Sequence, residues 1–297
     1  MNVLSLFDGM SCGQIALERA GVKVDNYYAS EIKAHAIKVA QYNYPSTIQL
    51  GDVTKLNTSQ LPKIDLLIGG SPCQDFSRLK VGDDRSGLRG SKSNLFYEYL
   101  RILKEVHPTY FLLENVKMKR EHKEELDNYL GVRGININSN MFSFQNRDRF
   151  YWTNISIAPY IDKNINFQDY KDTDTTYCFN FKANKTPSRV RMYEKQCPNV
   201  TYRKKINCVT CKQDRWSNSG LIDFDGFCRY LTTRELELAQ TVPIGYTKCL
   251  SMRQAENVLG DGWTVDVIAH ILKGIEHPYE LTDEEEQNKP LFDLGDK

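Results

Sequence analysis

The sequence predicts an α/β protein with a doubly wound, mostly parallel sheet and a small second domain. In the first half of the chain, short apolar runs alternate with helical patterns, which is typical of a parallel sheet covered by helices on both faces. The alternation ends near Asn154, where a polar region begins. A chain of 297 residues, 40% of them hydrophobic, can bury a core of this kind and is not a disordered protein.

Seven strands and four helices are expected before the alternation ends. The strands are short and apolar, and the helices carry apolar residues at helical spacing. The expected strands are Val3–Phe7, Tyr27–Ser30, Thr47–Leu50, Ile64–Ile68, Tyr110–Leu113, Ile135–Phe144 with a break, and Phe150–Thr153. The expected helices are Gln14–Ala20, Ala34–Tyr42, Leu95–Val106 and Glu121–Leu130.

The second half divides into three parts. Residues 160–225 are rich in Asn, Lys and Thr and lack helical periodicity, so we expect loops and short strands there. Helical patterns resume at Thr233–Thr241, Met252–Leu259 and Thr264–Ile275. The expected divisions are a sheet domain at 1–158, a second domain at 159–228, helices that return to the first domain at 229–276, and an acidic tail at 277–297.

The net charge of +1 conceals two opposite charge runs. Residues 182–215 hold ten Lys or Arg against two acidic residues, and Tyr193, Tyr202 and Trp216 are interleaved with them. This mixture suits contacts to phosphates and bases, although a charge run is commonly just a solvated face. Residues 276–297 hold eight acidic residues against two lysines, which is typical of a disordered, solubilising tail.

The composition also predicts where the protein works. No apolar run approaches the roughly 20 residues of a membrane span. The N-terminus has no basic region and reaches Asp8 too early for a signal peptide. Eight cysteines are too few for a disulfide scaffold in a chain of this length, which favours reduced thiols. We therefore expect a soluble, cytoplasmic protein that does not bind membranes, associated with the nucleoid if its host is a bacterium.

Three of the expected strands end in residues that suit a cofactor. The first runs into the glycine-containing turn Phe7–Gly13, the second ends at Glu31, and the third precedes Gly51-Asp52-Val53. An acid about 20 residues after such a turn can accept hydrogen bonds from ribose hydroxyls. A single turn of this kind is an ordinary βα connection, and the dinucleotide fingerprint GxGxxG is absent. Together, the three strand ends predict a site for an adenosine-containing cofactor without a pyrophosphate.

Two further strand ends carry reactive side chains. Cys73 lies in the loop Gly69–Ser77, which follows the fourth expected strand. An isolated cysteine is usually a small buried apolar residue, but this loop would present the thiol at the carboxyl end of a central strand. A thiolate there can act as a nucleophile when cationic neighbours lower its pKa. Glu114 closes the fifth strand beside this loop, where the alternative role is to cap the next helix.

A basic pair follows at Gln145-Asn146-Arg147-Asp148-Arg149, which we expect to open another strand. Alternation along a strand would place Gln145, Arg147 and Arg149 on one face, so that both guanidinium groups point into one cleft. The alternative is an edge strand in which Asp148 forms salt bridges with its neighbours.

Taken together, these segments resemble the ordered motifs of the DNA (cytosine-5)-methyltransferases. The resemblance extends from Met1 to about Ile275, and the combination of motifs in this order is specific. It is strongest for the de novo type with a short target-recognition domain, on Leu6–Gly9, Phe150–Trp152 and Gly262–Val265. The motifs are Phe7–Gly13, Ser71-Pro72-Cys73, Glu114-Asn115-Val116, Gln145–Arg149, and Arg229-x-Leu-Thr-x-x-Glu235 followed by Gln240.

The resemblance implies a Rossmann-like fold that binds S-adenosylmethionine, with 1–158 as the catalytic domain and 159–228 as the target-recognition domain. It further implies that Cys73 is the nucleophile, that Glu114 engages the ring nitrogen of cytosine, and that Arg147 and Arg149 hold the base. The residues on motifs that contact the cofactor are Phe7, Asp8, Gly9, Gly13, Glu31, Ile32, Asp52, Val53, Pro72, Leu95 and Trp263.

The implied activity is transfer of a methyl group to carbon 5 of a cytosine that is flipped out of duplex DNA, through a covalent cysteine adduct. The basic region 182–215 would hold phosphates and read base edges, and the chain can be paired with a cognate restriction endonuclease. A subgroup of the family performs the same reaction on transfer RNA. A third hypothesis is a nucleic-acid-binding relative that retains only the fold.

Two features depart from the family pattern or compete with it. The last motif has Gly260-Asp261-Gly262 where the family usually has Gly-Asn, and Asp266 occupies a position that is often apolar or proline. Cys208 and Cys211 have zinc-knuckle spacing, which would need two more thiolates such as Cys197 and Cys228 because no histidine lies nearby. We favour the alternative of two small residues on a strand of the recognition domain, and expect no metal.

Overall fold

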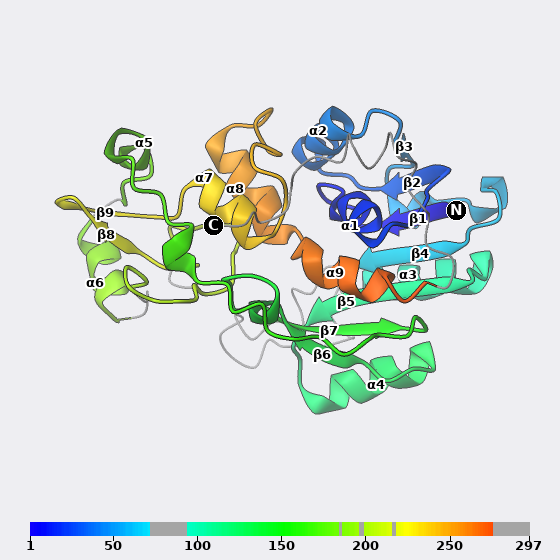
Figure 1. Ribbon diagram of the computed structural model, residues 1–297. Coiled ribbons are helices and arrows are strands. Elements are labelled where there is room, and N and C mark those ends of the chain that lie inside the picture. Colours follow the sequence, from blue (N-terminus) through cyan, green and yellow to red (C-terminus); the bar gives the residue numbers. More distant parts are fainter. Residues whose placement is uncertain (72–93, 184–185, 196–198, 216–217, 276–297) are drawn as a thin grey trace.

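A seven-stranded sheet lies at the end of the molecule opposite α5, α6, β8 and β9 in the computed structural model (Figure 1). The structure describes residues 1–71, 94–183, 186–195, 199–215 and 218–275. Within these residues the strand order is β3-β2-β1-β4-β5-β7-β6. The strands are β1 Asn2–Leu6, β2 Asn26–Ser30, β3 Ile48–Gln49, β4 Leu66–Gly70, β5 Tyr110–Val116, β6 Ile135–Asn138 and β7 Asp148–Thr153.

The strand directions confirm the predicted doubly wound, mostly parallel sheet. β1 pairs in parallel with both β2 and β4, and the parallel ladder continues to β3 on one side and β5 on the other. β7 is antiparallel to both β5 and β6. Because β1, β2, β4 and β5 are parallel, their carboxyl ends lie at the same edge of the sheet.

Successive strand residues pack into two separate apolar layers, one on each face of the sheet. Val3 and Ile68 pack with α1 and α9 on one face, whereas Leu4 and Leu67 pack with α3 and α4 on the other. Leu4, Leu67, Val3 and Ile68 are all fully buried, as expected for strands covered on both faces. The helices are α1 Cys12–Ala20, α2 Ala34–Asn43, α3 Asn94–Val106, α4 Arg120–Leu130, α7 Thr233–Ala239, α8 Met252–Asp261 and α9 Val265–Leu272.

Local signals in the sequence account for several helix ends. α1 ends at Gly21, whose left-handed backbone (φ 72°) lets its N–H reach the carbonyls of Leu17 and Glu18. α7 and α8 both begin with capping boxes, in which the hydroxyls of Thr232 and Ser251 accept hydrogen bonds from the third helical residue. Within the described part of the chain, the structure holds no helix with the length and apolar character needed to cross a bilayer.

The expected strand over Ile135–Phe144 is broken. β6 ends at Asn138, whose side chain caps the 3₁₀ helix η4 at Ser139–Met141 by accepting a hydrogen bond from Asn140 N. Among the described residues, three other short 3₁₀ helices are η1 Val53–Lys55, η2 Thr58–Gln60 and η5 Phe167–Asp169. Each begins at an Asp or Asn that caps it in the same way.

The prediction that residues 160–225 lack helices is wrong. They contain α5 (Thr175–Phe179) and α6 (Pro187–Lys195), together with β8 (Ile222–Phe224), which pairs with β9 (Phe227–Arg229). α5 is too short for an apolar repeat to show, and it begins instead at the Asp174 side chain, which accepts a hydrogen bond from Tyr177 N. α6 begins at Pro187, a residue that suits the first turn of a helix.

A buried ion pair joins this middle region to α7. The side chains of Arg229 and Glu235 are both fully buried, with Nη1 and Oε2 2.8 Å apart. Arg229 also donates from Nη2 to the backbone carbonyl of Asp172, and Glu235 accepts from the backbone N–H of Thr232. The predicted motif Arg229-x-Leu-Thr-x-x-Glu235 therefore closes on itself as one hydrogen-bonded unit. α7 and α8 lie between the middle region and the sheet in Figure 1.

Replacing one partner of this pair should destabilise the protein strongly. Glu235→Ala leaves a buried guanidinium without its counter-charge, so we expect the free energy of unfolding to fall by about 3–5 kcal/mol. Urea denaturation measures this change. The matched control is Glu124→Ala, which breaks the exposed pair between Arg120 and Glu124 and should change stability by less than about 0.5 kcal/mol. A loss at Glu235 no larger than at Glu124 would contradict this interpretation.

Candidate active site

The turn after β1 has an unusual backbone. Phe7, Gly9 and Ser11 all have positive φ angles, of 57°, 61° and 62°. Only Gly9 adopts this conformation without cost, so the surrounding structure must hold Phe7 and Ser11 in place. Strain of this kind concentrates where a loop is shaped for a ligand. The turn includes the predicted cofactor residues Phe7, Asp8, Gly9 and Gly13.

Asp8 points into the protein. Its Oδ1 accepts a hydrogen bond from the hydroxyl of Tyr27 (2.7 Å) and its Oδ2 accepts one from Ser11 (2.5 Å). Burial raises the pKa of Asp8 to about 6, although these hydrogen bonds act in the opposite direction. The Asp8 carboxylate therefore stabilises the turn from the inner side. The backbone N–H of Asp8 donates to the carbonyl of Ser30 at the end of β2 (3.1 Å).

Glu31 connects the ends of β1 and β2. Its Oε2 accepts a hydrogen bond from Gly9 N (2.8 Å), and its Oε1 accepts from the backbone N–H groups of Ile32 (2.7 Å) and Lys33 (2.9 Å). The side chain of Ile32 beside it is 71% exposed, which is unusual for a large apolar residue. The structure thus brings together a carboxylate and an uncovered apolar surface that the sequence assigned to one cofactor site.

The third strand end lies beside the second. Ser30 Oγ donates to the carbonyl of Gly51 (2.7 Å), which precedes Asp52 and the buried Val53. Asp52 Oδ1 accepts hydrogen bonds from the backbone N–H and the hydroxyl of Thr54, so this carboxylate caps η1. Its predicted contact to an adenine is an additional role that stays a prediction.

The donor set at these strand ends fits an adenosine-containing cofactor. Glu31 offers a carboxylate beside the backbone of the first turn, and Ile32 offers an apolar surface for a ring. Gly13 allows α1 to approach closely, because a Cβ there would lie 2.5 Å from Ile68 Cδ1 and 2.6 Å from Tyr27 Oη. Leu95 lies at the start of α3 and is half-buried. Pro72, the remaining predicted contact before α3, lies outside the described residues.

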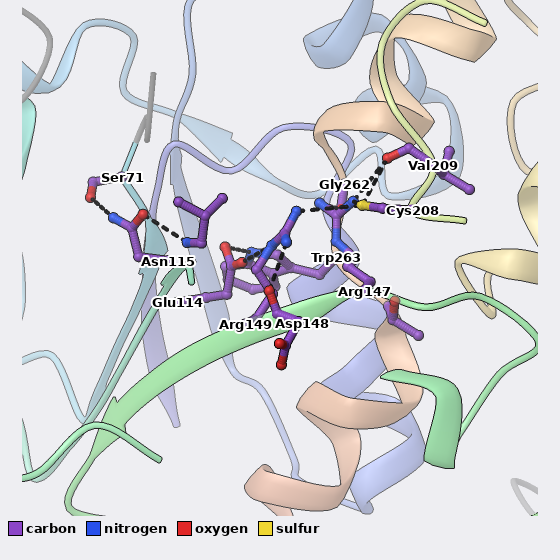
Figure 2. A network of polar contacts seen from close by, with 12 residues as sticks. Ser71, Glu114, Asn115, Arg147, Asp148, Arg149, Cys208, Val209, Gly262 and Trp263 are labelled. Atoms are coloured by element: carbon purple, nitrogen blue, oxygen red, sulfur yellow. Dashed lines mark hydrogen bonds and ion pairs between the residues drawn. The ribbon is translucent and has the colours of Figure 1, made fainter. Parts of the chain in front are cut away.

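Glu114 lies within β5 and is held from two directions. Its Oε1 is 2.9 Å from Arg149 Nε, and its Oε2 accepts a hydrogen bond from the indole N–H of Trp263 (3.1 Å). Glu114 is only 8% exposed, so these two contacts compensate a charge that is largely removed from water. Figure 2 shows Arg149 and Trp263 approaching the carboxylate, and the contact to Trp263 was not predicted.

Arg147 and Arg149 converge on one sulfur atom. Arg147 Nη1 lies 3.3 Å from Cys208 Sγ, and Arg149 Nη2 lies 3.7 Å from it (Figure 2). Arg147 also donates to the backbone carbonyls of Val209 (3.0 Å) and Gly262 (2.9 Å). The expected convergence of the two guanidinium groups is therefore observed, but β7 begins only at Asp148 and strand alternation is not the reason.

Gln145 has turned into the core instead. Its Nε2 donates to the carbonyl of Ala239 (2.6 Å) and to Gln240 Oε1 (2.8 Å), and its Oε1 accepts from the backbone N–H of Val209 (3.0 Å). Gln145 is fully buried. This amide fastens the segment before β7 to α7 and to the segment that carries Cys208, which positions the two arginines.

From the sequence, Cys208 was considered as a zinc ligand or, preferably, as a small residue on a strand. The strand placement is wrong, because Cys208 and Cys211 lie in none of the described strands. Burial raises the pKa of its thiol, but the charges of Arg147 and Arg149 outweigh burial and hold the pKa below its ordinary value. Cys211 instead donates from Sγ to Asp261 Oδ1 (2.8 Å), which also pairs with Lys33. The structure describes no group of three or more metal-ligating side chains outside the gaps in its coverage, and Cys197 falls in one of these gaps.

Asn115 links Glu114 to the predicted nucleophile loop. Its Nδ2 donates to Ser71 Oγ (3.1 Å), and both side chains are buried (Figure 2). Ser71 is the last residue described before Pro72 and Cys73, and these two residues lie outside the described part of the chain. Gly70 and Ser71, which precede Pro72 and Cys73 in the sequence, therefore lie beside Glu114 and Asn115.

The basic region presents charge and aromatic surface together. Tyr202 is 90% exposed, and the ammonium of Lys171 lies 5.8 Å from the centre of its ring. Lys182 lies in the same way over Phe179, at 5.1 Å. Lys205 is an exception, because its Nζ donates to the backbone carbonyls of Asn140 and Ser143. Where the structure describes side chains of this region, the exposed basic residues are Lys182, Arg191, Arg203, Lys204, Lys212 and Arg215.

The sequence and the structure were compared with those of known proteins. Residues 1–155 match the family model of the C-5 cytosine-specific DNA methylases. The chain is 37% identical over 166 residues to the orphan methyltransferase M.Rho11sI of Bacillus phage rho11s, covering 51% of this chain and 32% of the relative. It is 38% identical over 118 residues to the type II methyltransferase M.NgoBV of Neisseria gonorrhoeae, covering 38% of this chain and 27% of the relative. The match thus spans about a third of these relatives' length.

Solved structures share the fold over nearly the whole chain. The S. pombe Dnmt2 methyltransferase aligns with a TM-score of 0.74 at 19% identity, covering 92% of this chain and 97% of that one. A putative DNA modification methyltransferase from an E. coli prophage aligns with a TM-score of 0.64 at 20% identity, covering 93% of this chain and 98% of that one. These TM-scores show that the chain has the Rossmann-like methyltransferase fold.

The raised pKa of Asp8 makes a prediction about stability. Its folded pKa of about 6 exceeds the ordinary value of 3.8, so the folded state binds more protons between these values. The free energy of unfolding therefore falls as the pH rises from about 4 to about 6. In Asp8→Asn this decrease is absent, so the variant should gain about 2 kcal/mol, and at most about 3, relative to the native protein between pH 4 and pH 7.

Urea denaturation at several pH values measures this difference. Asp225→Asn makes the same charge change at an exposed position and serves as the matched control. A difference between Asp8→Asn and the native protein that does not vary with pH would show that Asp8 does not carry the proton.

Cys208 should react as an activated thiol. Alkylation by iodoacetamide, followed by mass spectrometry of the peptide, gives its rate as a function of pH. We expect the rate to titrate at a pH below that of a small thiol such as N-acetylcysteine, because two guanidinium groups stabilise the thiolate. In Arg149→Gln the midpoint should rise. A midpoint at or above that of the small thiol would contradict the electrostatic assignment.

Proposed function

Because the chain belongs to the C-5 cytosine-specific DNA methylase family, we propose that it methylates carbon 5 of cytosine in duplex DNA. Members of this family use S-adenosylmethionine as the methyl donor. The observation that carries the proposal is the Glu114 carboxylate, held by Arg149 and Trp263 beside Gly70, which lies three residues before Cys73 in the sequence. The reaction needs a carboxyl group and a thiol side by side at a base.

The chemistry explains why both groups are required. Carbon 5 of cytosine is too weak a nucleophile to attack a methyl donor directly. The Cys73 thiolate adds to carbon 6, forming a carbon–sulfur bond and moving electron density to carbon 5. Glu114, with a proton held at the ring nitrogen, stabilises the charge that develops there. S-adenosylmethionine supplies an electrophilic methyl group bound to a positively charged sulfur.

The remaining steps restore the protein and the base. Carbon 5 takes the methyl group, and the bond between that group and sulfur breaks to leave a neutral thioether. A proton acceptor then removes the proton from carbon 5 of the cytosine. The electron pair re-forms the double bond between carbons 5 and 6, and the bond to Cys73 Sγ breaks. Arg149, which already pairs with Glu114, holds the polar edge of the base. Arg147 is engaged with backbone carbonyls and with Cys208, and supports that arrangement.

The rest of the chain is assigned around this site. We propose that 1–158 is the catalytic domain, that 159–228 is the target-recognition domain, and that 229–276 returns to the catalytic domain. Lys171 beside the exposed Tyr202, and the exposed Lys182 beside Phe179, support phosphate and base contacts by the recognition domain. A base in a duplex must flip out to reach the carboxylate. We further propose that the chain acts in the cytoplasm, and the type II methyltransferases among its relatives support a partnership with a restriction endonuclease.

The test is methylation by the native chain and by Cys73→Ser. Expression in a host without cytosine methylation, followed by bisulfite sequencing, should show methylated cytosines in one sequence context, and none above background for the variant. Cys249→Ser removes a thiol elsewhere and should leave the activity unchanged. Activity that survives in Cys73→Ser would overturn the covalent mechanism. No methylation by the native protein would favour a binding module.

Purified protein separates the substrates. Duplex DNA and transfer RNA are compared with labelled S-adenosylmethionine, and label transferred to the RNA alone would replace the DNA substrate in this proposal. DNA with 5-fluorocytosine at the target tests the adduct. Fluorine cannot leave carbon 5 as a cation, so the elimination step is blocked and a complex that survives denaturing electrophoresis should accumulate with the native protein only.

A further inference from the structure

Trp263 is held firmly by its backbone. The carbonyl of the preceding residue, Gly262, accepts hydrogen bonds from Arg147 Nη2 (2.9 Å) and from Gln240 Nε2 (3.1 Å). The carbonyl of Trp263 itself accepts a contact from Cys12 Sγ at 3.7 Å, in the first turn of α1. These contacts come from three separate parts of the chain, so the direction in which the indole leaves the backbone is determined by the fold.

The indole is directed at the Glu114 carboxylate. Its Nε1 lies 3.1 Å from Glu114 Oε2 (Figure 2). Gly70, at the end of β4, makes room for this contact, because a Cβ there would lie 2.8 Å from the indole nitrogen and 3.0 Å from the carboxylate oxygen. A side chain at position 70 would therefore push the two groups apart. Three separate segments must agree for this one hydrogen bond to form.

The contact completes the restraint on the carboxylate. Arg149 Nε holds Oε1 at 2.9 Å, and without a second partner the carboxylate can pivot about that single contact. The indole N–H fixes Oε2 and with it the plane of the group. A donor that is already in place when charge develops on the base acts without reorganisation, which is the condition for electrostatic stabilisation of a transition state.

We propose that Trp263 is a positioning residue for Glu114, in addition to the cofactor contact that its motif implies. The same segment lies against the turn after β1, since a Cβ on Gly262 would meet Met10 Cε at 2.6 Å. One side chain thus reaches from the side of the methyl donor to the carboxylate that engages the base. The catalytic part of this inference rests on the proposed function, whereas the contact itself does not.

The contact is tested by NMR without any activity. Selective ¹⁵N labelling of the three tryptophans gives one indole N–H signal for each of Trp152, Trp216 and Trp263. Trp263→Phe and Trp152→Phe assign two of these signals. In Glu114→Gln the Trp263 signal should shift, because its carboxylate acceptor is gone, whereas the Trp152 signal should not. An unchanged Trp263 signal would overturn the proposal whatever the enzyme does.

Kinetics then tests the consequence. Phe keeps the aromatic ring but has no N–H, so Trp263→Phe should lower kcat about tenfold while the Kd for S-adenosylmethionine changes less than about threefold. Trp152→Phe is the matched control, since the Trp152 indole donates to Asp127 Oδ1 (2.7 Å) on α4 and packs in the apolar layer on the other face of the sheet from Trp263. It should leave kcat unchanged. Equal losses in kcat and cofactor affinity for Trp263→Phe would reduce Trp263 to a cofactor contact.

Discussion

The arrangement of the site depends on one nearly buried carboxyl group that must be fixed in direction. Glu114 lies on β5, in the middle of the sheet, and both of its oxygens are occupied by donors from other parts of the chain. An ionised carboxylate removed from water is expensive unless its oxygens are satisfied. The guanidinium of Arg149 and the indole of Trp263 meet this requirement, and in doing so they determine where β7 and the segment before α9 must lie.

A second set of contacts supports the first. Gln145, Gln240 and Arg147 connect the start of β7 to α7 and to the segment around Cys208 through buried hydrogen bonds. The segment around Cys208 therefore approaches the Glu114 carboxylate through a sulfur atom that both arginines contact. A displacement of this segment would reach Arg147 and Arg149 through few atoms.

The sequence predicted those parts of the fold whose signals are local. Apolar runs located β1, β2, β4 and β5, and helical patterns located α1 and α7. The sequence did not reveal α5, which is too short for an apolar repeat, or α6, a largely polar helix that begins at Pro187. From the order of the motifs, the sequence predicted that Glu31, Glu114, Arg147 and Arg149 lie near the edge formed by the carboxyl ends of the parallel strands. It could not show that Trp263 contacts Glu114, 149 residues away, or that Cys208 lies beside Arg147 rather than beside Cys211.

The reversed direction of β7 has a geometrical consequence. In a wholly parallel sheet, the edge formed by the carboxyl ends of the strands receives no residues from the start of any strand. Because β7 runs against β5, Arg149 near its beginning lies opposite Val116 at the end of β5. The start of β7 and the end of β5 thus lie at the same edge of the sheet. Arg149 is two register positions from the pair formed by Glu114 and Tyr151. The reversed strand lets this edge of the sheet carry polar residues from the start of a strand as well as from the ends of strands.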